Sequence, residues 1–179
     1  MSKTDTNTRF LTPLPQIIRE LPKDFADEIL VSTQDKRGET FAALMSVTSI
    51  ALKFRPNIWR TWPKARQREW LWTNLHQSRF ADTARQLLQD WFFNNRAAML
   101  NSFLDSLGIF HDSEGCIRED LPESLDDAKV RLGVDSLLGA YPPREVALYL
   151  RLFQYGHPLN SGWESIASCL GSDSRFAAE

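Results

Sequence analysis

The chain has 179 residues, enough for one domain or two closely packed halves that bury about 70% of the surface an unfolded chain exposes. Hydrophobic residues make up 42% of the sequence, charged residues 25% and aromatic residues 11%, and the net charge of −2 excludes a global positive field that would draw the whole molecule to nucleic acid or anionic lipid. Two cysteines, Cys116 and Cys169, are too few for a disulfide framework, and no apolar stretch reaches the about 20 residues that a membrane span needs.

The N-terminal segment MSKTDTNTR is polar and lacks the apolar run of a signal peptide. We therefore expect a soluble, cytoplasmic protein that does not bind a membrane. Residues 1–9 are expected to form a disordered leader, residues 10–171 a helical domain with a candidate joint between subdomains near 108–123, and residues 172–179 a C-terminal tail.

Prolines mark the expected helix starts in the first half of the chain. Thr12 is a candidate N-cap for a helix that begins at Pro13, and Pro22 begins the next helix in the same way. Apolar residues at helical spacing follow over 41–52, and Pro63 opens a further helix.

The clearest helical period of the sequence covers residues 80–107. Gly108 is the expected C-cap, and Asn94-Asn95 favours a break that would divide this segment into two helices. The next segment, GIFHDSEGCI, has a polar centre between apolar arms, which predicts a loop or a small hairpin over 109–117.

Three more helices are predicted in the last third. Ser124 and Asp127 are a weak capping box for a helix that ends at Gly139, and Pro142-Pro143 begins a helix that is apolar around most of its circumference and hence buried. Ser161 and Glu164 form a capping box before the last short helix. No segment alternates as a strand does, so the expected fold is all-α: a single-domain bundle of about seven or eight helices with the small loop or hairpin near 109–117.

Charge and tryptophan are distributed unevenly along the chain. The stretch WRTWPKARQREWLWTNLH, from position 59, carries four of the six tryptophans, and residues 53–79 hold seven Lys or Arg against one acid, Glu69. Residues 105–127 hold eight acids against one base, Arg118. The simplest interpretation is that the two regions pair with each other or are solvated, as surface ion pairs usually are.

A binding surface for protein is the function that these features favour. Trp and Arg are the residues most enriched in the energetic centres of protein interfaces. The residues that we expect to form this surface are Trp59, Arg60, Trp62, Arg66 and Trp70. The predicted role is therefore non-catalytic: a helical protein that binds a protein partner or forms a homo-oligomer, with no cofactor.

Nucleic-acid binding by the stretch Lys53–Arg79 is the alternative. It would require the cations Lys53, Arg55, Arg60, Lys64, Arg66 and Arg68 to converge on one side, with aromatic rings between them. On a helical wheel, the basic residues of the quoted stretch are scattered around the axis instead.

A metal-dependent hydrolase is the third and least favoured interpretation. His76, His111-Asp112 and Asp135 follow the order H…HD…D of helical phosphohydrolases of the HD type, in which such residues hold a metal that activates water. Here, however, Gly108 is expected to end the helix before the HD pair, and no companion motif is present. Cys116 beside His111 likewise lacks the third group of a nucleophilic site.

Overall fold

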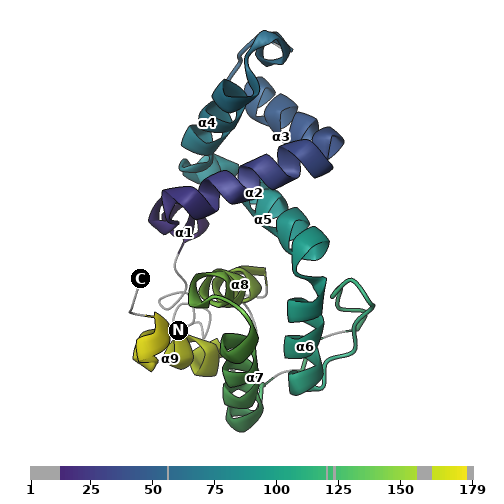
Figure 1. Ribbon diagram of the computed structural model, residues 1–179, viewed down its shortest axis with the longest axis vertical. Coiled ribbons are helices and arrows are strands. Elements are labelled where there is room, and N and C mark those ends of the chain that lie inside the picture. The colour runs from purple at the N-terminus through teal and green to yellow at the C-terminus, as the bar shows by residue number, and fades with distance from the viewer. Residues whose placement is uncertain (1–12, 56, 120, 123, 157–162, 177–179) are drawn as a thin grey trace, which may run out of the picture. The chain divides into compact units, whose positions relative to one another are not determined.

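A computed structural model describes residues 13–55, 57–119, 121–122, 124–156 and 163–176, and over these ranges the chain is helical, without a strand (Figure 1). The predicted all-α fold is thereby confirmed. Nine α-helices occur in this part of the chain, against the seven or eight expected, because the periodic segment 80–107 forms two helices. None of these helices has the length and apolarity that crossing a bilayer requires.

The chain divides into two compact units. The first, called here the N-terminal unit, is Pro13–Trp91, and the second, the C-terminal unit, contains the described residues from Phe92 onward. The described residues of 108–123, where the sequence suggested a joint, belong to the C-terminal unit.

The N-terminal unit contains the helices that begin at prolines. Pro13, Pro22 and Pro63 each stand at the N-cap, one residue before the first helical residue, and Thr12 lies outside the described residues. A proline suits the edge of a helix because its fixed φ and missing N–H cost nothing there. The elements of this unit are α1 (Leu14–Glu20), α2 (Lys23–Lys36), α3 (Gly38–Ala51), η2 (Ile58–Thr61), α4 (Lys64–Leu75), η3 (Ser78–Phe80) and most of α5 (Ala81–Asn95).

Large apolar side chains fill the core of the N-terminal unit. Phe25 of α2 and Trp91 of α5 are fully buried and meet edge to face, with ring centroids 5.4 Å apart. α3 packs against both α2 and α4 and buries the face that the sequence predicted. The buried residues of α3 are Phe41, Leu44, Met45, Thr48 and Ser49, whereas Leu52, at the end of the expected apolar segment, is half-buried. The opposite face of α3 remains in solvent.

α5 and α6 (Ala97–Leu107) are separated by a single residue, Arg96, as the pair Asn94-Asn95 favoured. The backbone of Arg96 leaves the helical region (φ −138°, ψ 26°), and its guanidinium forms a two-pronged ion pair with Glu145, which is only 3% exposed. The break is therefore held by a buried ion pair.

In the C-terminal unit three α-helices pack around a fourth, α7. α7 (Asp127–Ala140) contacts α6, α8 (Pro143–Gly156) and α9 (Trp163–Ser172), and η4 (Ser174–Phe176) lies against α8. α8 is buried around most of its circumference, as predicted. α6 and α7 come so close that a Cβ on Gly133 would lie 2.2 Å from the Oγ of Ser106.

The start of α7 differs from the prediction. Asp126, and not Ser124, is the N-cap, and its carboxylate accepts hydrogen bonds from the backbone N–H groups of Ala128 and Lys129. An aspartate suits this position because its negative charge also interacts favourably with the positive, N-terminal end of the helix dipole. The second predicted cap, Ser161, lies outside the described residues.

The predicted hairpin follows α6. Gly108 ends the helix in the left-handed conformation (φ 73°), and an antiparallel bridge then joins His111 to Ile117. Gly115 makes the turn at φ 85°, where its missing Cβ lets the hairpin lie directly on Leu100 of α6. We refer to residues 109–117 as the hairpin.

Candidate protein-binding surface

The connection between α3 and α4 forms one end of the N-terminal unit, at the top of the view in Figure 1. Lys53 adopts a left-handed φ of 53°, and the next residue, Phe54, donates its N–H to the carbonyl of Ser49 at 2.9 Å. This is the pattern that ends many helices, with a lysine where glycine is usual. A second left-handed residue, Asn57 at φ 68°, turns the chain into η2.

Phe54 belongs to a group of three rings that we call the three-ring cluster. Its centroid lies 5.7 Å from that of Trp62 and 5.9 Å from that of Trp70, and the two tryptophan centroids are 5.8 Å apart. Phe54 is 36% exposed, and both tryptophans are half-buried. Such spacings are typical of aromatic pairs that stabilise each other. The cluster therefore holds large apolar rings rigidly at the surface.

Two arginines stack on tryptophans of this region, one of them in the three-ring cluster. The guanidinium of Arg66 stacks over Trp62 at 4.6 Å, and that of Arg60 lies over Trp59 at 5.4 Å. A cation over an indole face gains about 0.5–1 kcal/mol at an exposed site. That energy is small, but the stacking orients both exposed arginines, which have no carboxylate partner among the described residues.

Trp59 differs from the other four residues expected at this surface. It is 4% exposed, and its indole Nε1 is buried without a hydrogen-bond partner among the described residues. It belongs to the core beneath η2, whereas Arg60, Trp62, Arg66 and Trp70 all reach solvent.

Exposed aliphatic residues also occur in α3 and in the connection that follows it, and the sequence reasoning missed them. Ile58, in the same connection, is 38% exposed. Val47 and Ile50 on the outer face of α3 are 53% and 66% exposed. The signal in the sequence is their spacing, since Val47 and Ile50 fall on the side of α3 opposite the buried Phe41, Leu44 and Met45. We call Phe54, Ile58, Arg60, Trp62, Arg66 and Trp70 together the tip surface.

The cations around the tip surface fall into two groups. Lys64 pairs with Asp35 of α2 at 2.8 Å, and Arg68 donates to the side-chain oxygen of Gln34 at 2.6 Å. Among the described residues, no carboxylate lies within ion-pair distance of Arg60 or Arg66. The positive charge of the tip surface is therefore uncompensated in the part of the chain that the structure describes.

A groove lies beside the tip surface, between α2 and α4. It has a volume of about 510 Å³, with Leu30, Val31 and Trp72 as its larger apolar residues. Two bases, Lys23 and Arg68, and two acids, Asp27 and Glu69, line the groove, so their formal charges cancel.

The four residues of the hydrolase interpretation are involved in other contacts. His76 ends α4, where its backbone carbonyl accepts a hydrogen bond from Arg19 and its half-buried ring has a lowered pKa, mainly because of burial. Asp135 pairs with Arg175. In the described part of the chain, no three His, Cys, Asp or Glu side chains are placed to hold a metal ion.

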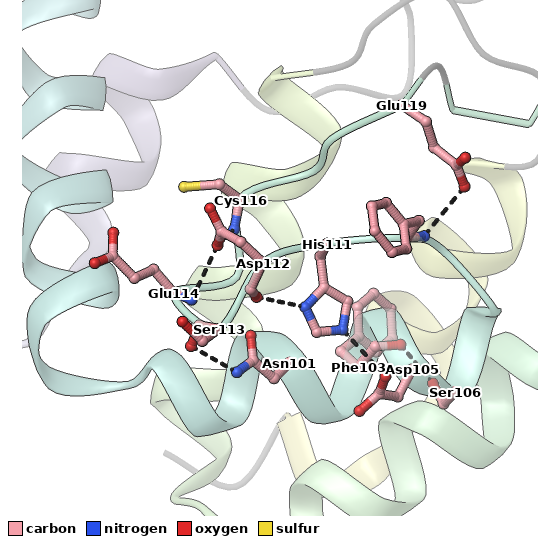
Figure 2. Close-up of polar contacts among 11 residues, drawn as sticks. Asn101, Phe103, Asp105, Ser106, His111, Asp112, Ser113, Glu114, Cys116 and Glu119 are labelled. Atoms are coloured by element: carbon pink, nitrogen blue, oxygen red, sulfur yellow. Dashed lines mark hydrogen bonds and ion pairs between the residues drawn. The ribbon is translucent and has the colours of Figure 1, made fainter.

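The HD pair serves the hairpin itself, as Figure 2 shows. One oxygen of Asp112 accepts the N–H groups of Glu114 and Cys116, both at 2.9 Å, and its other oxygen pairs with Arg118. These contacts, led by the bond from Cys116, lower the pKa of Asp112. A carboxylate that closes its own turn in this way is a structural group.

Both ring nitrogens of His111 are occupied. Nδ1 lies 2.7 Å from the backbone oxygen of Asp112, and Nε2 lies 3.1 Å from the carboxylate of Asp105 on α6 (Figure 2). These contacts, the backbone one first, raise the pKa of His111. Burial raises the pKa of the Cys116 thiol, so the nucleophilic thiolate is disfavoured at neutral pH. The arrangement fastens the hairpin to α6 and offers no activated nucleophile.

Comparison of the chain with protein-family models, with curated proteins and with solved structures finds no match in any of the three.

Proposed function

We propose that this chain acts by binding another protein through the tip surface. The observation that carries the proposal is the three-ring cluster with Arg66 stacked on Trp62 and no carboxylate beside it in the described residues. Rings and guanidinium are already ordered, so a partner would lose little side-chain entropy on binding them. Interface centres are typically built from such preorganised Trp and Arg side chains.

The rings and the charges are expected to contribute different amounts to the free energy of binding. Burying a further 100 Å² or so of ring and isoleucine surface contributes roughly 2.5 kcal/mol, whereas each exposed ion pair contributes about 0–1 kcal/mol. The rings and Ile58 would therefore supply most of the affinity. The arginines would steer the encounter and select partners that carry negative charge.

The experiment that tests this proposal places a photo-crosslinking phenylalanine analogue at position 58 of the full chain. After irradiation in lysate of the source organism, we expect a defined protein adduct that survives nuclease treatment and is lost in the Arg66→Glu variant. The matched control carries the crosslinker at Leu132 of α7, which is 68% exposed and belongs to the other unit. Equal adducts from both positions, or none from position 58, would overturn the proposal.

Single substitutions refine the test once a partner is captured. Trp62→Ala and Arg66→Ala are expected to weaken binding at least about tenfold, or 1.4 kcal/mol, without loss of helical signal. Trp72→Ala and Lys64→Ala on α4 are the controls, because they remove another tryptophan and another cation that lie outside the tip surface. Nucleic acid in place of protein at position 58, with affinity falling steeply with salt, would favour the alternative interpretation instead.

A further inference from the structure

The C-terminal unit presents a surface whose chemistry complements the tip surface. Phe110, at the start of the hairpin, is 63% exposed, which is unusual for a phenylalanine. Its backbone N–H donates to Glu119 at 3.3 Å, so an acid lies directly beside it. Two exposed acids belong to this region, Glu119 beside Phe110 and Glu114 at the turn at the other end of the hairpin, whereas the tip surface carries exposed bases (Figure 2).

The charge of this second surface is negative on balance. Within the described residues 105–119, the acids are Asp105, Asp112, Glu114 and Glu119, and the one base, Arg118, is already paired with Asp112. Glu114 points away from α6, at the outer side of the turn (Figure 2). We call Phe110, Glu114 and Glu119 the acidic knob.

We propose that the occupant of the tip surface is the acidic knob of a second copy of the same chain. Phe110 would contact Ile58 and the three-ring cluster, and Glu114 and Glu119 would meet Arg60 and Arg66. This inference rests on the proposed function, because it names the partner of the same surface. Such a contact would cover the exposed apolar residues and the uncompensated charges of both surfaces.

The symmetry of such a contact has a consequence that experiments can detect. A tip surface and an acidic knob are different patches, so the contact is heterologous, and each chain offers both. Two chains can exchange both contacts and close a dimer, or one contact each can continue into a longer chain. Either way, two copies that each lack a different patch retain one functional contact.

Mixing two variants, each of which lacks a different patch, tests whether one functional contact is retained. The tip variant carries Arg60→Glu and Arg66→Glu, and the knob variant carries Phe110→Ser and Glu114→Lys. All four side chains are exposed, so both variants keep their cores. Arg85→Glu on α5 and Asp27→Lys on α2 provide matched charge reversals outside both patches.

Sedimentation equilibrium at low salt, over roughly 10–500 µM to suit a small interface, measures the outcome. We expect the wild type and both controls to self-associate, each variant alone to have a dissociation constant raised at least about tenfold, and the mixture to form a 1:1 complex. Raising salt should weaken association, since screening shortens the reach of the charges.

Three results would overturn the inference: a wild type that stays monomeric, variants that associate as the wild type does, or a mixture that forms no complex. A monomeric wild type would also be the result if acidic and basic regions pair within one chain. Failure of the second-copy inference can be told apart from failure of the proposed function. A monomer that still gives Arg66-dependent crosslinks to another protein from position 58 refutes the second copy and leaves the tip surface as a binding site.

Discussion

At the scale of single residues, the two described histidines differ in the direction of their pKa shifts. Contacts with Asp112 and Asp105 raise the pKa of His111, whereas burial, with help from the charge of Arg19, lowers that of His76. His111 therefore stabilises the fold fully below its unfolded pKa of about 6.5 and loses this contribution as pH rises through its folded pKa. His76 contributes above about 6.5 and loses its contribution as pH falls through its folded pKa.

Denaturant unfolding of His111→Gln and His76→Gln across pH 5 to 8 tests these signs. The stability difference between wild type and His111→Gln should shrink as pH rises, while the difference for His76→Gln should shrink as pH falls. Parallel pH dependence of the two differences would show that one of the assigned environments is wrong.

The buried pair of Arg96 and Glu145 gives a second prediction at this scale. Arg96→Met would leave Glu145, 3% exposed, without its guanidinium, and we expect a loss of about 3–5 kcal/mol in the free energy of unfolding. The double variant Arg96→Met/Glu145→Met should be more stable than Arg96→Met alone, since no charge is then buried unpaired. Urea unfolding of the two single variants and the double variant measures this coupling. A double variant less stable than Arg96→Met would contradict it.

At the scale of elements, two glycines differ in whether the fold requires them: the backbone needs a glycine at position 115 but not at position 139. Gly115→Ala would put a Cβ 2.6 Å from that of Leu100 at a φ of 85°, so we expect a loss of at least about 2 kcal/mol. Gly139→Ala, inside α7 with nothing within 4 Å of the new Cβ, should instead gain about 0.5–1 kcal/mol. Thermal unfolding compares them, and the hairpin amides of Gly115→Ala should also lose hydrogen-exchange protection. Equal changes in thermal stability for Gly115→Ala and Gly139→Ala would mean that the hairpin does not lie on α6.

The helices themselves follow from the sequence because their signals are local. Prolines precede α1, α2 and α4 directly, and the apolar spacing along α3 and α8 gives their buried faces. The cap at Ser124 is wrong for an equally local reason: Asp126, two residues later, is the better placed acceptor. Neighbouring polar residues compete for one cap, and sequence alone does not rank them.

The tip surface was harder to predict because it depends on the backbone between helices. Trp62, Arg66 and Trp70 were expected at a surface, yet Trp59 of the same stretch is buried and Phe54 joins the cluster. Both outcomes follow from the left-handed residues Lys53 and Asn57, which redirect the chain. Neither is a glycine, and although asparagine often adopts this conformation, lysine rarely does, so the residue types mark only the second of these turns.

At the scale of the whole molecule, each unit has its own buried core, and this predicts two cooperative transitions on unfolding. Tryptophan reports them separately, because five of the six tryptophans lie in the N-terminal unit and the sixth is Trp163. In a Trp163→Phe background, fluorescence observes the N-terminal unit alone, whereas far-UV circular dichroism observes helices of both.

Gly133→Ala then perturbs one unit selectively. Its Cβ would collide with Ser106 inside the C-terminal unit, which we expect to cost about 1–3 kcal/mol there. The fluorescence midpoint in urea should stay where it is, while the circular dichroism curve divides into an earlier and a later transition. If both signals instead move together, α5, which runs through the boundary at Trp91 and Phe92, couples the units into one cooperative fold. Two transitions would mean that tip surface and acidic knob can each be altered without unfolding the other, which the mixing of variants requires.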